Sequence, residues 1–536
     1  MATTFANFVL LALVIASGTV PRPQPAPNLG CPVAQDPDGP GTSIWAYFDD
    51  SGQLTYGAFP TGDRLLDYSY AGYAGGGVAI PFAPAQQYVE PSGCDDDAPA
   101  IQAAIDAVSQ LDPDENGIRG AVQLAPGTFN LLGSLAIRTS GVVLRGSGSG
   151  SDGTILIVGG DPRALISIQG TGSWAAVGRR ATILDDYVPA GANSFTLDDA
   201  TELQVGATVL VDRPVTDAWV HFMGMDHLVR SGQHQTWIRA GTPIHSDRVI
   251  TAIDGNQVTV DAPISDSIDA QYLSPPEATV VRYTFVGRLT QVGLESMTFI
   301  APPVPTPISQ PIFSLLQIRS VMNGWVRDVV AQDFINGLSI DGTSKWITIE
   351  DMAFTHTVPA DTSSGSPADY GIDGQQILIH RSASQGDHWF SVVTQATEPG
   401  PNVVLNFYAD GNPTNLAPHQ RWATGLLLDN VFSPRAGIAL QDRGNAGSGH
   451  GWSIGWGVLW NSVANTLLIQ RPPGSTNWSI GSSGRRTTTY EPGDPTRTPL
   501  PEGTIDSHET RVAPGSLYLE QLCERLGPSA LTNIGY

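Results

Sequence analysis

Side chains that can transfer protons and bind charged groups are concentrated between residues 385 and 486. His, Arg and Trp recur there in short segments that glycines flank, and the segments are 386–389, 400–403, 418–425, 441–445, 447–452 and 477–481. Glycine lets a backbone approach a ligand closely. This composition therefore predicts a binding or catalytic site rather than ordinary turns.

The chemistry of these residue types suggests two sets. An imidazole titrates near neutral pH and can transfer a proton, while an arginine binds a carboxylate through two parallel hydrogen bonds. The candidate catalytic residues are His419, Arg421, His450, Arg443 and His388. Hydrogen-bonded structural roles for the histidines and ion pairs between neighbouring coils for the arginines are the alternatives.

The second set could bind a substrate, because aromatic rings pack against apolar faces and amides and carboxylates accept or donate hydrogen bonds. The candidate substrate-binding residues are Trp422, Trp452, Trp478, Asp387, Asp442, Asn402, Gln395, His227 and Trp219. The last two belong to the long segment 217–243, which we expect to form a wall of the binding groove, since long loops are often functional. Core packing is the alternative for the tryptophans.

The elements that must position these residues are short strands. The 59 glycines and 41 prolines favour many turns and little helix. Similar short segments recur, with their second residues at 328, 351, 381, 407, 430 and 461, which is the period of a solenoid. Stacked coils of this kind share one continuous core. They would also bring the candidate residues onto one flank.

One helix is expected near the amino-terminal end. Asp97 can cap it, Pro99 lies in its first turn, and Ile101, Ile105 and Val108 form an apolar stripe. The run DDAPAIQAAIDAV, followed by VQLAPGTF and GVVLRGSG, resembles the entry of pectate-lyase-like right-handed β-helix proteins over about residues 67–150. The resemblance implies an all-β, right-handed parallel β-helix with a capping helix. It implies an activity on polysaccharides without fixing which one.

The expected organisation follows from these patterns. We predict a signal peptide at 1–18, an extended segment at 19–94, the capping helix with the first coils at 95–192, and a small β-rich insertion at 193–290. The main β-helix with the groove occupies 291–500, and a tail or cap occupies 501–536. An apolar run too short to span a bilayer supports the first assignment and hence secretion.

The leading functional hypothesis is a polysaccharide lyase. β-Elimination from a uronic acid needs a neutralised carboxylate and a base for the C5 proton; Arg421 or Arg443 could do the first, and His419 or His450 the second. The chain has a single lysine, Lys345, which departs from several lyase families. The rival is an inverting glycoside hydrolase that uses Asp373, Asp387 and Asp442. A non-catalytic glycan-binding β-helix is the third alternative.

Charge and metal-ligand types narrow the partners. A net charge of −24 repels nucleic acid and also a polyanionic sugar, unless a local basic cleft binds it. We expect an acidic polysaccharide or oligosaccharide substrate, no nucleic acid and no membrane partner, and the oligomeric state stays open. No cofactor or metal site is expected; calcium at Asp361, Asp369 and Asp373 is only a weak alternative. A disulfide could join Cys31 to Cys94, although three cysteines leave the pairing open.

Overall fold

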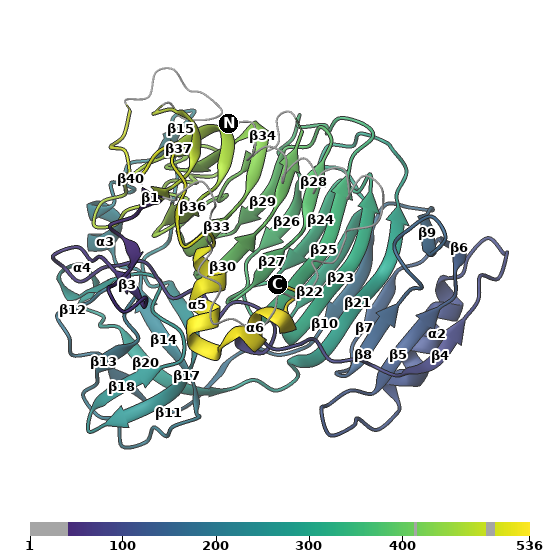
Figure 1. Cartoon of the computed structure of the whole chain (residues 1–536), viewed down its shortest axis with the longest axis horizontal. Coiled ribbons are helices and arrows are strands. Elements are labelled where there is room, and N and C mark those ends of the chain that lie inside the picture. Colours follow the sequence, from purple (N-terminus) through teal and green to yellow (C-terminus); the bar gives the residue numbers. More distant parts are fainter. Residues whose placement is uncertain (1–40, 412–414, 489–498) are drawn as a thin grey trace.

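The computed structural model describes residues 41–411, 415–488 and 499–536. It is a right-handed parallel β-helix whose coils stack along the long axis of the molecule (Figure 1). Most of its strands join one 27-stranded parallel sheet that folds around the core. The sheet has three faces, which we name A, B and C. The predicted signal peptide at 1–18 and Cys31 lie outside the described residues, so secretion stays a prediction.

Each face is a column of strands that pair with the coil before and the coil after. Face A contains β4 (Ala85–Val89), β5 (Gly120–Leu124), β8 (Val142–Arg145), β27 (Leu378–His380), β30 (Pro399–Leu405), β33 (Ala423–Asp429), β35 (Ile454–Gly455), β36 (Val458–Trp460), β38 (Trp478–Ile480) and β40 (Thr504–Asp506). Face B contains β6 (Gly127–Leu131), β9 (Thr154–Val158), β28 (Ala383–Gln385) and β31 (Tyr408–Asp410). The long strands β21 (Leu289–Ile300), β23 (Val321–Gln332) and β25 (Lys345–Thr355) bend from face A onto face B.

Face C contains β7 (Leu135–Ile137), β10 (Ala164–Gln169), β22 (Ser314–Arg319), β24 (Asn336–Ile340), β26 (Ala368–Ile372), β29 (Phe390–Thr394) and β32 (Asn415–Leu416). The strands β34 (Phe432–Leu440), β37 (Val463–Ile469) and β39 (Ser483–Arg486) begin on face B and continue onto face C.

The repeat seen in the sequence is the corner between faces A and B. The second residues of the recurring segments have left-handed backbone angles: Asp328 (φ 54°), Asp351 (φ 52°), Arg381 (φ 46°), Asn430 (φ 54°) and Asn461 (φ 49°). At the remaining corner the left-handed residue is Asn406 (φ 50°), one position before the predicted Phe407. Asp and Asn tolerate this conformation better than most side chains. The predicted solenoid period is therefore confirmed, because it marks a repeated bend.

The core of the solenoid is a continuous stack of apolar side chains from Val89 to Ile469. The predicted helix is α2 (Ala98–Ser109), which buries Ile101, Ile105 and Val108 against the first coils. It lies at one end of the solenoid and covers apolar side chains that no further coil would bury (Figure 1). The capping helix is confirmed.

The β-rich insertion lies at the side of the later coils (Figure 1). Its antiparallel sheet contains β11 (Ala175–Thr182), β20 (Thr279–Thr284), β14 (Thr208–Pro214), β17 (Pro243–Asp254), β18 (Gln257–Val260) and β13 (Ser194–Thr196). Smaller elements are β12 (Tyr187–Val188), β19 (Ile268–Asp269), α3 (Asp217–Phe222), α4 (Ala270–Leu273), β15 (Val229–Arg230) and β16 (Gln233–His234).

Buried ionic groups fix the insertion to the solenoid. Lys345 at the start of β25 is 1% exposed, and its Nζ lies 3.0 Å from Asp247 Oδ1 of β17. Arg288 binds the same carboxylate at 2.9 Å. Arg248 is fully buried and donates to the Gly400 carbonyl of the solenoid at 2.6 Å. The only lysine of the chain is thus a structural residue, because each buried charge here has an opposite charge or a hydrogen-bond partner.

The two ends of the described chain cover face A. The segments β1 (Gly41–Thr42), β2 (Ala46–Phe48), β3 (Leu54–Tyr56) and η1 (Tyr73–Gly75) lie beside α5 (Leu517–Leu526), α6 (Pro528–Asn533) and β41 (Val512–Ala513). Apolar side chains of β2, β3, β41, α5 and α6 form one cluster with Trp460 and Trp478 of face A, while Tyr73 of η1 packs on Trp325. Cys523 in α5 is disulfide-bonded and Cys94 is free. The pairing of Cys31 with Cys94 considered from the sequence is therefore wrong.

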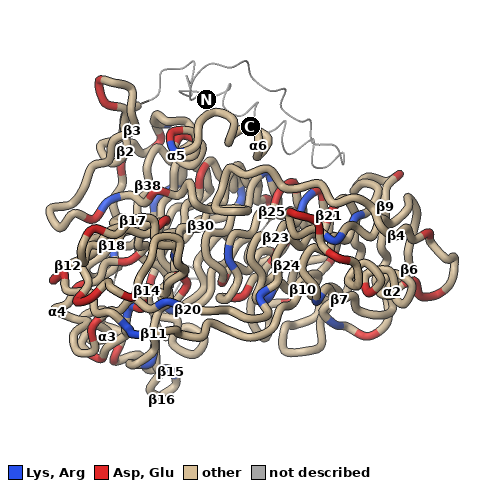
Figure 2. Tube along the Cα trace, turned by 90° about the horizontal axis from the view of Figure 1, so that it is seen from below, with Lys and Arg blue, Asp and Glu red and all other residues tan. Residues whose placement is uncertain are grey.

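Acidic residues occur along the whole trace, from the α2 end to the insertion, rather than in one patch (Figure 2). In the described part of the chain, no helix is long and apolar enough to cross a membrane.

Candidate functional site

A row of polar side chains follows four neighbouring strands of face C. Asp341, Asp373, Gln395 and His419 occupy matching positions after β24, β26, β29 and β32. Three backbone bonds hold them in register: Asp373 N donates to Ile340 O at 2.9 Å, Gln395 N to Ile372 O at 3.0 Å, and His419 N to Thr394 O at 3.0 Å. Neighbouring strands lie about 4.8 Å apart. We name these four residues the face-C row.

The two carboxylates of the row differ in environment. Asp341 accepts hydrogen bonds from the Ser344 hydroxyl at 2.8 Å and the Ser320 amide at 3.1 Å. Burial, followed by the negative charge of Asp341, raises the pKa of Asp373 to about 6. Asp373 thus keeps a proton at mildly acidic pH. A carboxyl group with a raised pKa is suited to donate a proton to a leaving group.

A third carboxyl group lies beneath the row. Glu398 accepts hydrogen bonds from Gln395 N at 3.2 Å and Asn402 Nδ2 at 2.5 Å. It is 2% exposed, and burial, followed by the charge of Asp373, raises its pKa well above the ordinary value. Glu398 therefore supports the turn that carries Gln395, and burial favours its neutral form.

The other end of the row is basic. The His419 ring meets the His450 ring edge to face at 4.7 Å, and its Nδ1 lies 3.2 Å from Gln395 Oε1. Burial, and then the charges of Arg443 and Arg421, lower the pKa of His419 to about 4. Burial and Arg443 lower the pKa of His450 to about 3. Both imidazoles are neutral near pH 7, so they can bind a substrate by hydrogen bonds without carrying charge.

The surface beside the row is hollowed. A groove of about 260 Å³ is lined by Gln395 and His419 and, on the preceding strands, by Gln317, Ser339 and Gly371. These side chains are small or polar and point outward between the inward-facing residues of face C. The row therefore stands at the edge of an open groove that runs across the strands.

A second, larger cavity lies between the solenoid and the insertion. Its volume is about 1220 Å³. Its aromatic lining includes Trp219, Phe222, Tyr272, Trp422 and Trp452. The Phe222 and Tyr272 rings are stacked at 4.0 Å. The segment 217–243 supplies part of this lining, as expected for a wall of a binding site.

The charged lining of this cavity is mostly acidic. Four aspartates face two arginines there, and these residues are Asp63, Asp266, Asp269, Asp442, Arg213 and Arg471. Asp266 accepts bonds from the indoles of Trp422 at 2.7 Å and Trp456 at 2.9 Å. Arg213 lies 3.1 Å from the same carboxylate. The excess of carboxylates makes this cavity a poor place for a polyanionic chain.

The sequence-predicted residues divide between these two places. Gln395 and His419 line the groove; Trp219, His227, Trp422, Trp452 and Asp442 line the cavity. Arg443, 9% exposed, donates to the His419 carbonyl at 2.8 Å and so lies with His450 at the basic end of the row. The predicted residues therefore do not all converge on one flank: some lie at the groove of face C and others at the cavity.

Three predicted roles need correction. Trp478 is fully buried on face A, 5.8 Å from the Trp456 ring, so it offers no platform to a sugar. Asn402 is 1% exposed and bonds to Ile377 N at 2.7 Å, which makes it a residue of the coil interior. Arg421 donates to Trp237 O at 2.6 Å and to Ser448 Oγ at 2.7 Å, so it fastens the insertion to the solenoid rather than binding a carboxylate.

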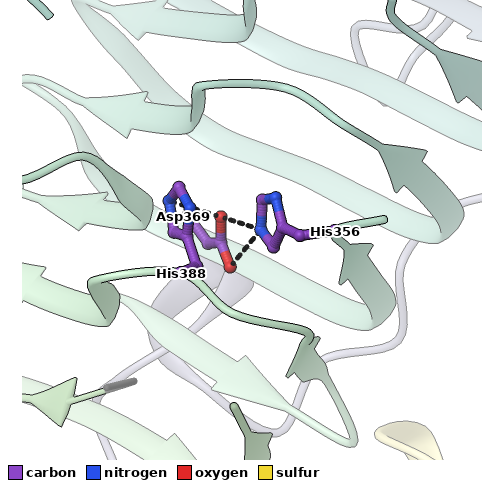
Figure 3. Close-up of side chains that lie close together, drawn as sticks. All are labelled: His356, Asp369 and His388. Atoms are coloured by element: carbon purple, nitrogen blue, oxygen red, sulfur yellow. Dashed lines mark hydrogen bonds and ion pairs between the residues drawn. The ribbon is translucent and has the colours of Figure 1, made fainter. Parts of the chain in front are cut away.

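His388 and Asp387 are also displaced from the predicted site. They follow β28 at the corner between faces B and C, and Asp387 points to solvent. The His388 Nε2 lies 3.2 Å from Asp369 Oδ1, and the ring stacks on His356 at 4.0 Å (Figure 3). Neither residue lines the groove or the cavity. The catalytic role predicted for His388 in this groove is therefore wrong.

The calcium alternative is not supported by the geometry either. In the described ranges, the group of three side chains close enough to share a metal ion is His356, Asp369 and His388. Asp361 instead accepts a bond from Ser363 N at 2.8 Å, and Asp373 belongs to the row. The three aspartates weighed for calcium do not come together.

Asp341 and Glu398 were missed by the sequence reasoning, and Asp373 entered only through the rival hypotheses. A signal for two of them exists: the triplet Ile-Asp-Gly occurs at 340–342 and 372–374, and a third time at 253–255, in the β17–β18 hairpin of the insertion. A repeated Asp at the end of two neighbouring strands predicts two carboxylates on one face. Nothing comparable marks Glu398.

Comparisons with known proteins concern the fold alone. The chain matches no protein-family model and no curated protein. Its structure is similar to the tailspike protein gp49 from Pseudomonas phage LKA1, with 12% identity, a TM-score of 0.32, and coverage of 77% of this chain and 72% of that chain. For the tailspike protein of E. coli bacteriophage HK620 in complex with pentasaccharide, the identity is 10%, the TM-score 0.36 and the coverage 85% and 63%. For the A-module of the Azotobacter vinelandii mannuronan C-5 epimerase AlgE6, the identity is 10% and the TM-score 0.30, and the match covers 79% of this chain and 96% of that chain.

Proposed function

We propose that the protein hydrolyses glycosidic bonds of a polysaccharide that lies in the groove of face C, with Asp373 as the general acid and Asp341 as the second carboxyl group. The observation that carries this proposal is the pair of carboxyl groups at matching positions of adjacent strands, in the same row as Gln395 and His419, which line the groove. Glycoside hydrolysis needs two such carboxyl groups beside the scissile bond.

The proposed reaction assigns one role to each group. Asp373 donates its proton to the glycosidic oxygen as the bond to the anomeric carbon breaks. Asp341 stabilises the positive charge that develops on the sugar ring, and water completes the reaction by adding OH to the anomeric carbon and a proton to Asp373. Gln395 and His419 lie next along the row and can bind hydroxyl groups of the sugar.

The lining of both hollows supports a sugar chain as the substrate. The groove presents polar side chains such as Gln317, Asn336 and Gln395, which suit hydroxyl groups, beside the apolar Ile308, Phe390 and Val393. The cavity presents aromatic rings, which suit the apolar faces of sugar rings. Because its carboxylates outnumber its arginines, a neutral or amino-sugar chain fits the cavity better than a uronate chain. The proposal therefore departs from the acidic substrate expected from the sequence.

β-Elimination is the second candidate, and the basic end of the row favours it. His419 is a neutral imidazole beside Arg443, which is the pair that a lyase needs for its base and its carboxylate site. Two observations weaken it. A pKa of about 4 makes His419 a poor base near neutral pH, and the guanidinium of Arg421 already bonds to Trp237 and Ser448.

One experiment separates these candidates. Purified protein is incubated with neutral, amino-sugar and uronic-acid polysaccharides, and reducing ends and ultraviolet absorbance are followed together. Hydrolysis raises the reducing ends alone, whereas elimination also creates an absorbing C=C bond. Asp373→Asn should abolish hydrolysis and His419→Ala should leave part of it. Absorbing products that require His419 would replace the proposal with the lyase, and bound glycan that survives unchanged would leave a binding protein.

A further inference from the structure

A buried cluster at the corner between faces B and C is separate from the groove and the cavity. His356 follows β25, Asp369 belongs to β26 and His388 follows β28, so neighbouring coils supply the three side chains (Figure 3). Their side chains are 5%, 0% and 2% exposed. The hydrolytic chemistry proposed above uses none of them.

The spacing of their polar atoms matches a metal-binding set. His356 Nε2 lies 3.0 Å from Asp369 Oδ1 and 3.2 Å from Oδ2, and His388 Nε2 lies 3.2 Å from Oδ1. The nearest atoms of all three lie within 4.8 Å of one another. Ligands at about 2.0–2.2 Å from a tetrahedral zinc ion are separated by roughly 3.3 Å. The two imidazole–carboxylate distances, 3.0 Å and 3.2 Å, are therefore close to those of such a site, and all three ligand atoms lie within 4.8 Å of one another.

The outer contacts of the cluster hold its ligands in place. The Ser384 hydroxyl donates to Asp369 Oδ2, as groups outside a metal site often do. Gly386 has φ 95°, and a Cβ atom there would lie 2.3 Å from the His356 carbonyl oxygen. Only glycine permits this turn to approach so closely, and the turn leads directly to His388. The local backbone is thus arranged to bring the second imidazole onto the first coil.

We propose that His356, Asp369 and His388 bind one divalent transition-metal ion of the zinc class, which links neighbouring coils at this corner. Two imidazoles and one carboxylate suit zinc, cobalt or nickel, whereas calcium and magnesium prefer oxygen ligands alone. The rings lie 2° from parallel. Binding therefore turns the His388 ring so that its Nε2 points at the ion, and a water molecule fills the fourth position.

The ion would be structural. Asp369 lies next to Ala368, and His388 lies two residues before Phe390; Ala368 and Phe390 both line the groove of face C. The segment 357–367 also packs here, with Ala360 N donating to Asp387 O at 3.0 Å. A metal ion would thus fix the edge of the groove and the loop beside it without contacting a sugar.

The test measures metal binding and not activity. Untagged full-length protein is stripped with a chelator, loaded with Zn²⁺ or Co²⁺, dialysed and analysed for metal content, with Co²⁺ followed by its visible absorption. We expect about one equivalent per chain, a higher Tm with zinc, and at least about tenfold weaker binding in His388→Gln. Ser384→Ala, which keeps all three ligands, should weaken binding less.

A matched control is available on the surface. His221, Asp226 and His227 are the same residue types, with His221 Nδ1 2.6 Å from Asp226 Oδ2, but they are solvent-exposed. His221→Gln should leave the metal content and the Co²⁺ spectrum unchanged. The proposal would be overturned if wild-type protein retained no metal after loading and dialysis and showed no Tm shift. Equal losses of bound metal in His221→Gln and His388→Gln would also overturn it. If His388→Gln does not fold, the metal content and the Tm of the stripped and the loaded wild-type protein still test the proposal.

Discussion

The groove of face C and the cavity beside the insertion are built in opposite ways. The groove arises from repetition, because Asp341, Asp373, Gln395 and His419 occupy the same position in successive coils. The cavity arises from one long-range contact, in which Trp422 and Trp452 of the solenoid join the apolar cluster of the insertion. The first places ionisable groups side by side at a fixed spacing, and the second gathers aromatic surface.

This difference assigns different tasks to the two regions. Proton transfer needs groups fixed relative to one another, which a backbone ladder provides. Binding of an extended chain needs area more than exact placement, which the packed insertion provides. We therefore expect substitutions in the row to change kcat and substitutions in the cavity to change KM.

The largest effect should come from Asp373→Asn. The amide cannot donate the proton that the leaving oxygen needs, so kcat should fall by about 10²–10⁴-fold while KM changes little. Initial rates of reducing-end release on the best glycan of the panel measure this. Asp387→Asn is the matched control, because Asp387 is exposed at another corner and should keep full activity. Equal rates for Asp373→Asn and wild type would show that the reaction does not take place at the face-C row.

The sequence predicted the fold because the solenoid repeats a local signal. Left-handed corners at Asp328, Asp351 and Asn461 recur at a recognisable period, and each is a property of a few neighbouring residues. The face on which a side chain lies is a different matter. The face of a side chain depends on the number of residues between that side chain and the last corner. Trp478 therefore lies on face A, although its neighbours in the sequence are similar to those of Trp452, which packs against the insertion.

Long-range packing explains the remaining errors at the site. Nothing near Arg421 in the sequence shows that the carbonyl of Trp237 will accept its hydrogen bond. Nothing near Trp478 shows that α5 and the amino-terminal strands will cover it. The Ile-Asp-Gly triplet is a local signal for Asp341 and Asp373, but it also occurs at 253–255 in a hairpin of the insertion, so the triplet alone does not identify face C.

A smaller effect is expected from Phe222→Ala in the cavity. Its ring stacks on Tyr272 at 4.0 Å and lines the cavity. A sugar ring packed on this aromatic surface would lose a contact that we take to be of the size of an aromatic pair, about 0.5–1.5 kcal/mol. KM should rise by roughly two- to tenfold with kcat unchanged. Tyr88→Ala is the control, because Tyr88 is 74% exposed on β4, far along the chain from both hollows. A drop in kcat without a change in KM would show that the cavity takes part in the chemical step and not in substrate binding.

A shift of the pH profile should follow Asp341→Asn. The charge of Asp341 helps to raise the pKa of Asp373 to about 6, so its removal lowers that pKa. The proton on Asp373 is then lost at lower pH, and the alkaline limb of residual kcat/KM should move toward acid. Profiles of wild type and Asp341→Asn measured at constant ionic strength test this. An unchanged or alkaline-shifted limb would show that another group controls it.

The smallest effect on activity is expected from a carboxyl group that belongs to neither region. Asp429 on face A is fully buried beneath α5, accepts a bond from Tyr518 N at 2.9 Å, and has its pKa raised by burial to about 7. A raised pKa means that the folded protein holds this proton more tightly than the unfolded chain does. The free energy of unfolding should therefore fall as the pH rises from about 4 to 7 and level off above that range.

Thermal unfolding of wild type and Asp429→Asn should show this slope in the wild type and a flatter one in the variant. Activity per folded molecule should be equal in both, because the groove and the cavity keep their side chains. A variant that retains the wild-type slope would assign the pH dependence to other buried groups, and a loss of activity without a loss of stability would show that face A is coupled to the groove.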